Sequence, residues 1–194
     1  MTTFKEIQAY YDALNEAFQS QKESNTFNSD RSHNATIFRF MLDNSKAIKM
    51  YCGELSVFRQ GFYDYVEKNA EQGEGVKIMD AMSESLRTFL AKDDTHLTII
   101  VENYTPGLLK DVVVDEFAEA VKRGQVELRQ LGDDLSFKKV LNHFMVTDSK
   151  IVRAEQSKEE HSAVCTMHDD AYYQMIDKSF NKLYLLSNQY KNLG

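Results

Sequence analysis

The first apolar positions of the chain recur every three or four residues, which is the spacing of one helical face. Thr3 and Glu6 form a capping-box pattern at the start of this run. We therefore predict an amphipathic N-terminal helix within residues 1–24. A regular 3-4 spacing is typical of helix–helix seams, so the stripe is a candidate self-association interface; the alternative is that it covers the protein's own body. The stripe consists of Phe4, Ile7, Tyr11, Leu14 and Phe18.

The periodicity is lost over residues 25–32, where polar residues predominate, and we predict a linker there. From residue 33 to residue 194, helical patterns alternate with short apolar segments of strand length, which predicts one α/β domain. Helices are expected at 32–47, 56–70, 78–89, 111–123 and 170–190, and strands at 48–52, 97–102, 125–131, 140–148, 151–156 and 162–167.

The order of these elements predicts a mixed, largely parallel sheet flanked by helices on both faces. Segment 97–102 is almost continuously apolar, as expected of a central strand buried on both faces. With helix 111–123 and strand 125–131 it fits a parallel βαβ unit. The last three strands are joined by short polar connections, which are typical of hairpins.

Composition narrows the function classes. The 194 residues carry 23 Lys and Arg against 30 Asp and Glu, a formal net charge of -7, which argues against a dedicated nucleic-acid surface. No run approaches the roughly 18 apolar residues of a membrane span, and residues 1–14 lack the apolar core of a secretory signal. We expect a cytoplasmic protein with no membrane partner. Cys52 and Cys165 lie in apolar segments and are expected to be small core residues.

The same order of elements, with a strand that ends at Asp148 and is followed by a hairpin and a last helix, resembles a single phospholipase D-like domain over about residues 33–190. The signature of that family is His-x-Lys-x-x-x-x-Asp. Counted back from Asp148, Leu141 stands at the histidine position and His143 at the lysine position. The resemblance implies a histidine nucleophile and a lysine that neutralises phosphate oxygens. Leu141 can supply neither function, so the resemblance implies a chain without the usual catalytic pair.

A polar cluster is expected where such an active site would lie. Arg153 and Glu155 are two residues apart on the next strand and therefore face the same side of the sheet. With His143 and Asp148 they form a candidate pocket for a phosphate, a nucleotide or a peptide carboxylate, in which Arg153 offers a planar pair of donors. The alternative is an ion pair of Arg153 with Glu155 or Asp148 that fixes the hairpin.

Other candidate sites are weaker. His161, Cys165 and His168 cannot converge on a metal ion from a regular strand, because position 168 has the opposite parity. No glycine-rich phosphate loop is present, so we expect neither a metal nor a cofactor. His33, beside Arg31 and Asn34, begins a helix whose amides could attract an anion; the alternative is an ordinary helix start.

From these patterns we expect a non-catalytic phospholipase D-like interaction or sensing module that self-associates or joins a protein complex. The stock of 10 Tyr and 12 Phe supports an interface, because aromatic residues are enriched there. Two alternatives stay open. One is a phosphodiesterase or nuclease that uses His143 across a dimer, and the other is an anion- or nucleotide-binding regulator.

Overall fold

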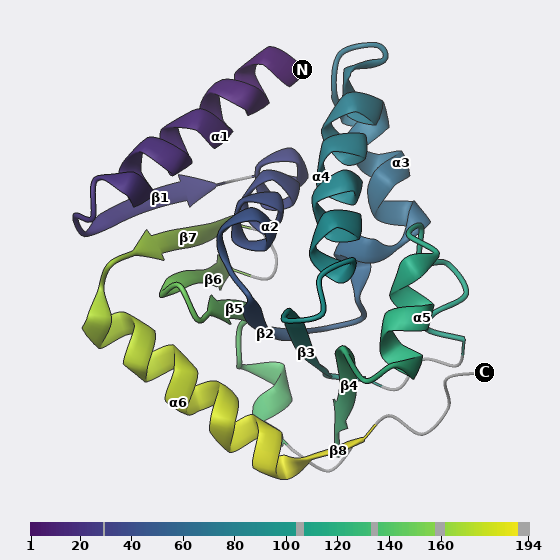
Figure 1. Cartoon of the computed structure of the whole chain (residues 1–194), viewed down its shortest axis with the longest axis vertical. Helices are drawn as coiled ribbons and strands as arrows, with labels where there is room; N and C mark the ends of the chain where they lie inside the picture. The colour runs from purple at the N-terminus through teal and green to yellow at the C-terminus, as the bar shows by residue number, and fades with distance from the viewer. Residues whose placement is uncertain (29, 104–106, 133–135, 158–161, 190–194) are drawn as a thin grey trace.

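The computed structural model describes residues 1–28, 30–103, 107–132, 136–157 and 162–189 (Figure 1). Within them a single sheet runs in the order β1-β7-β6-β5-β2-β3-β4-β8. The strands are β1 (Ser24–Asn28), β2 (Ala47–Cys52), β3 (His96–Val101), β4 (Val126–Leu131), β5 (Phe144–Thr147), β6 (Ile151–Ser157), β7 (Ser162–Met167) and β8 (Ser187–Gln189). The α-helices are α1 (Phe4–Gln19), α2 (Arg31–Asn44), α3 (Gln60–Asn69), α4 (Glu74–Leu90), α5 (Glu116–Lys122) and α6 (Asp170–Leu186), and two short 3-10 helices are η1 (Ser56–Phe58) and η2 (Ser136–Lys139).

The mixed α/β sheet expected from the sequence is confirmed, with its parallel part confined to the centre. Strand β3 pairs in parallel with both β2 and β4, as the βαβ pattern predicts. The other described pairings are antiparallel, so the sheet is not largely parallel. The connection of β5 to β6, residues 148–150, shows why, because a turn of this length cannot make a parallel crossover.

Helices cover both faces of the sheet, as predicted (Figure 1). Alternate strand residues divide the core in two: Ile99 packs with the residues of α1 to α5, whereas its neighbour Ile100 packs with those of α6. The same alternation in β6 places Ile151 under α1 to α5, and Val152 and Ala154 under α6. Side chains of β6 with odd numbers therefore share the face that α2 covers.

The apolar stripe of α1 lies on the protein's own body, which is the second of the two alternatives. Ile7 is 2% exposed and Leu14 is 1% exposed, and both belong to the core under α1 to α5. The remaining members, Phe4, Tyr11 and Phe18, are partly buried against the same core. Because this face is already covered within one chain, it is not a free surface for a second copy.

The predicted linker at 25–32 is wrong, because Ser24–Asn28 forms β1 and α2 begins at Arg31. Strand β1 runs antiparallel to β7, with Thr26 opposite Cys165. Its sequence lacks apolar alternation because it is an edge strand with a neighbour on one side, and the side chain of Phe27 is 76% exposed. The polar segment is therefore structural.

The two cysteines are buried free thiols, as expected, and burial raises the pKa of each to about 12. Within the described ranges, no helix combines the length and the apolar content that crossing a bilayer requires.

Candidate functional site

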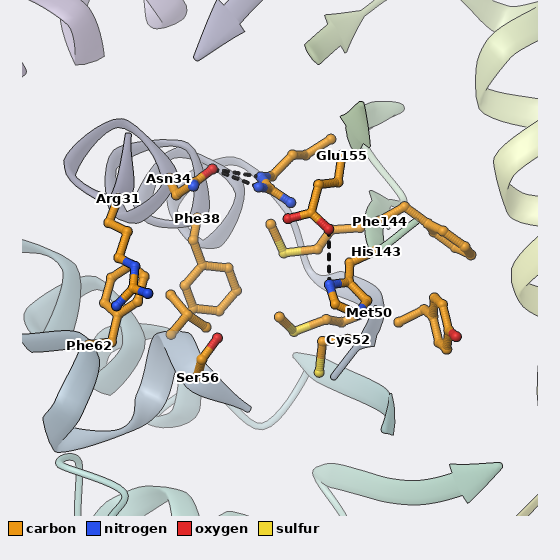
Figure 2. A pocket seen from close by; sticks show the side chains of 14 residues that line it. Arg31, Asn34, Phe38, Met50, Cys52, Ser56, Phe62, His143, Phe144 and Glu155 are labelled. Atoms are coloured by element: carbon orange, nitrogen blue, oxygen red, sulfur yellow. Dashed lines mark hydrogen bonds and ion pairs between the residues drawn. The ribbon is translucent and has the colours of Figure 1, made fainter. Parts of the chain in front are cut away.

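A pocket lies between the first turn of α2, the end of β2 and the facing ends of β5 and β6 (Figure 2). The space in it that water can enter is about 120 Å³. Several waters or one small molecule would fit, since one water occupies roughly 10–15 Å³ on this measure. Its lining is Arg31, Asn34, Phe38, Met50, Tyr51, Cys52, Ser56, Val57, Phe62, His143, Phe144, Met145, Arg153 and Glu155.

Three of the four predicted site residues line this pocket: His143, Arg153 and Glu155. Arg153 and Glu155 share the face of Ile151, under α2, because strand side chains alternate. His143 directly precedes β5 and lies opposite Glu155, whose backbone amide donates to the His143 carbonyl at 2.9 Å. The structure therefore brings these three residues together at one pocket.

The His143 imidazole lies between two carboxylates. Its Nδ1 atom is 3.0 Å from Glu155 Oε2, and its Nε2 atom is 3.3 Å from Glu102 Oε1 (Figure 2 shows the first contact). The hydroxyl of Tyr51 donates to the same Glu102 oxygen at 2.8 Å. Tyr51, Glu102, His143 and Glu155 thus form a polar chain across the edge of the pocket.

In this group of four side chains, neighbouring charges stabilise the ionised forms of His143 and Glu155. Burial lowers the pKa of the His143 imidazole, but the close carboxylates of Glu102 and Glu155 outweigh burial, so this pKa lies above its ordinary value. For Glu155, burial raises the pKa, yet the contacts with His143 and the charge of Arg153 prevail and lower it. At neutral pH, His143 is therefore more protonated than a free histidine and Glu155 is ionised.

Arg153 is buried, with 8% of its surface exposed, and is held by a neutral side chain. Its Nε and Nη2 groups both donate to Asn34 Oδ1, at 3.0 and 2.7 Å (Figure 2). Within the described residues its guanidinium forms no ion pair. The expected ion pair with Glu155 or Asp148 is therefore wrong, because Asn34 takes the guanidinium and His143 takes Glu155. Burial lowers the pKa of Arg153, the direction expected of a cation removed from water.

Asp148 is not part of the pocket, which corrects its place in the predicted cluster. It follows β5, whereas His143 precedes it, and five residues of extended chain span roughly 17 Å. The exposed Asp148 carboxylate accepts the backbone amides of Lys46 and Ala47 at 3.0 and 3.1 Å. Its function in the fold is to join the β5–β6 turn to the start of β2.

Leu141, at the family's histidine position, does not line the pocket either. Its side chain packs against the core under α6, together with Phe137. Its backbone amide donates to the Phe137 carbonyl at 3.0 Å, which ties the segment before β5 to η2. The pocket therefore contains one imidazole, that of His143, among the residues the structure describes.

Sequence reasoning did not identify Glu102 or the role of Asn34. Glu102 is the first charged residue after the apolar run of β3, and parallel strands place their carboxyl ends at one edge of a sheet, which could have signalled it. Of the three residues expected at the start of α2, Arg31 and Asn34 line the pocket, whereas the Nδ1 atom of His33 lies 2.8 Å from the carboxylate of Asp30. The guanidinium of Arg31 lies 4.0 Å from the ring centre of Tyr65.

Within the described residues, no group of three or more His, Cys, Asp and Glu side chains is placed to hold a metal ion. Of the histidines and cysteine considered for a metal, His161 lies outside the described residues. Cys165 is buried, and His168 Nε2 is 2.8 Å from the Phe18 carbonyl, which explains its orientation.

Solved structures share this fold at low sequence identity. TrmBL2, an archaeal chromatin protein with a novel mode of DNA binding, is 11% identical with a TM-score of 0.57; the match covers 96% of this chain and 65% of TrmBL2. The phospholipase D family member Nuc from Salmonella typhimurium is 11% identical with a TM-score of 0.52, covering 88% of this chain and 99% of Nuc.

NucT from Helicobacter pylori is 12% identical with a TM-score of 0.52, covering 87% of this chain and 99% of NucT. The chain thus spans slightly less than two thirds of TrmBL2 and nearly all of Nuc and NucT. No family model matches the sequence, and no curated protein matches it. At these identities the likeness establishes the architecture alone: the chain has a phospholipase D-like α/β fold.

Proposed function

We propose that the chain is a non-catalytic sensing module of phospholipase D-like fold that binds a small ligand through an anionic group at Arg153. The observation that carries this proposal is a guanidinium that is 8% exposed, lines a pocket and is held by the neutral Asn34. A buried cation without a carboxylate in direct contact is unfavourable unless something compensates it. An anionic ligand would supply that compensation.

The pocket has donors to offer such a ligand. A guanidinium carries five N–H donors, and the contacts with Asn34 use two of them. Arg31 lines the same pocket, and the described part of the chain gives it no carboxylate partner. Its guanidinium is instead stacked on Tyr65, which leaves its charge available. Two arginines on one pocket favour an anion by charge and by planar donor geometry.

The geometry of His143 argues against the enzyme alternative. Attack on phosphorus requires a ring nitrogen with a free lone pair. Each ring nitrogen of His143 lies beside a carboxylate, and the raised pKa favours the protonated ring, which has no such lone pair. The surroundings of His143 therefore favour a charged ring over a nucleophilic one.

The proposal includes a protein partner but not a nucleic acid. We do not extend DNA binding or nuclease activity to this chain, because its net charge is -7 and the likeness to the solved structures concerns the fold. A partner protein or second copy, which would read out the ligand state, would bind away from the α1 stripe. That stripe packs on the chain's own core.

The proposal is tested by ligand-dependent stability and calorimetry. Inorganic phosphate, AMP, acetate and free amino acids at 0.1 to about 10 mM are added to the wild-type chain, because a ligand that binds the folded state raises the melting temperature. We expect a saturable rise with at least one of these ligands, lost in Arg153→Gln and reduced in Arg31→Gln. Arg87→Gln, which changes an arginine 43% exposed on α4, should keep it. No rise with any ligand, or a rise that survives Arg153→Gln, contradicts the proposal.

A further inference from the structure

The wall of the pocket carries two opposite charges that do not neutralise each other directly. Arg153 and Glu155 are both 8% exposed and line the same pocket from the same face of β6. They influence each other's ionisation, yet they form no ion pair with one another. Asn34 holds the guanidinium and His143 holds the carboxylate, so the two charges stay separate (Figure 2).

The placement of these charges on one face of β6 suits a small zwitterion. Two residues along a strand lie about 7 Å apart at their Cα atoms. Their charged groups start from neighbouring positions of one strand face, from which they can approach the carboxylate and the ammonium of one small molecule. An ionised carboxylate such as Glu155 can accept several hydrogen bonds, so the His143 contact leaves it capacity for an ammonium.

The remaining lining favours an apolar third substituent. Phe38, Met50, Val57, Phe62 and Met145 surround the charged wall with hydrocarbon and thioether groups. These side chains would bury an aliphatic, thioether or aromatic group, whereas a ribose or a chain of phosphates would lose its hydration without new partners. The space of about 120 Å³ also limits the ligand to a small molecule.

We infer that the pocket recognises a free α-amino acid with an apolar side chain, its carboxylate at Arg153 and Arg31, its ammonium at Glu155. This inference rests on the proposed function and narrows it from anions in general to one class. A simple anion meets the attraction of Arg153 but also the repulsion of Glu155, whereas a zwitterion is attracted by both. The preference for the zwitterion should therefore depend on Glu155.

The test compares matched ligands by calorimetry on the full chain. Leucine carries both charges, 4-methylpentanoate lacks the ammonium, and 3-methylbutylamine lacks the carboxylate. Methionine and phenylalanine test the side-chain site, and inorganic phosphate and AMP represent the competing ligand class. We expect at least one of the three amino acids to bind. For the amino acid that binds best, the analogue that lacks the ammonium and the analogue that lacks the carboxylate should each bind about tenfold more weakly or worse. This is the loss expected for a charge-assisted hydrogen bond.

Variants separate the two charges. Glu155→Gln should abolish the advantage of leucine over 4-methylpentanoate, whereas Arg153→Gln should weaken both. Arg31→Gln, at a partly exposed position, provides a second reduction of carboxylate binding if the buried Arg153 variant fails to fold. Glu84→Gln, at a carboxylate 74% exposed on α4, is the matched control and should leave the affinities unchanged.

The outcomes distinguish the inference from the broader proposal. If phosphate or AMP binds in an Arg153-dependent manner and no amino acid does, the inference is wrong and the proposed function stands. If 4-methylpentanoate binds the wild type as tightly as leucine, the inference is equally wrong. If no ligand of either class binds, both fail.

Discussion

The guanidinium of Arg153 donates two hydrogen bonds to a single acceptor, the Oδ1 atom of Asn34. This contact joins β6 to the first turn of α2 across 119 positions of sequence. The amide of Asn34 orients the guanidinium but cannot neutralise it. Among the described residues, the guanidinium of Arg153 therefore has no carboxylate in direct contact, although the charge of Glu155 acts on it from the same strand.

Replacing this amide with a carboxylate tests that idea. Asn34→Asp would place a carboxylate in direct contact with the guanidinium, so we expect the melting temperature to stay the same or rise. The ligand should then bind at least about tenfold more weakly and stabilise the fold less. Asn34→Ala should instead lower the free energy of unfolding by about 1–3 kcal/mol, because a buried donor loses its acceptor. Both are measured by thermal and urea unfolding with and without ligand. Asn188→Asp, on the exposed part of β8, is the control for an added charge, and equal ligand response in Asn34→Asp and wild type would contradict the prediction.

The polar chain through His143 predicts a pH dependence with a definite sign. Because the folded-state pKa of His143 lies above its ordinary value of 6.5, its stabilising contribution is complete below that pH and is lost as pH rises through the folded-state pKa. Urea unfolding from about pH 5.5 to 8.5 should therefore show wild type losing stability relative to His143→Gln as pH rises. The exposed His96→Gln should follow the wild type. A parallel profile for His143→Gln and wild type would show that the carboxylates do not hold the proton.

Glu155 gives the opposite dependence at the acidic end. Its pKa is lowered in the folded state, so its contribution is present above its ordinary value of 4.5 and is lost as pH falls through the folded-state pKa. In unfolding experiments between about pH 2.5 and 5.5, the gap in stability between wild type and Glu155→Gln should narrow with acidification. A gap that widens there would contradict the assignment.

The packing of α1 predicts a stability effect with no change of assembly. Ile7→Ala should lower the free energy of unfolding by about 2–4 kcal/mol, because it removes a fully packed side chain from the core. Glu16→Ala, on the exposed face of α1, should have little effect. Light scattering should give the same mass for Ile7→Ala and wild type. A mass change confined to Ile7→Ala would restore the stripe as an interface.

Catalysis is tested directly at His143. With bis(4-nitrophenyl) phosphate we expect no hydrolysis above that of the buffer, with or without His143→Ala. Turnover by wild type that disappears in His143→Ala would establish the enzyme alternative.

Asp148→Asn, outside the pocket, should lower the free energy of unfolding by about 1 kcal/mol through its amide contacts and leave ligand binding unchanged.

The spacing of apolar residues predicted most helices and central strands, because each of these elements buries residues at a regular interval. The run 97–102 marked a central strand, and helix 170–190 matched α6 up to Leu186. The edge strands β1 and β8 were missed for a physical reason. Among the described strands each has a single neighbour, and each includes exposed residues, so it carries little apolar alternation.

The candidate site was predicted where one strand sets the geometry and missed where several elements meet. Residues 153 and 155 share a face by strand parity, which sequence reveals. Proximity along the sequence misled for Asp148, because β5 carries it to the far end of the strand. Asn34 and Glu102 reach the pocket only through the packing of α2 and β3, and that arrangement is a property of the tertiary fold.

Strand β1 shields the long backbone edge of β7 from solvent. A shortened protein beginning after residue 28 would bare that row of amides and carbonyls together with the apolar side of α2 that α1 covers. Such an open edge is a template for pairing between molecules. A chain that begins after residue 28 should therefore be less soluble than the full chain, chiefly because the apolar side of α2 would be exposed.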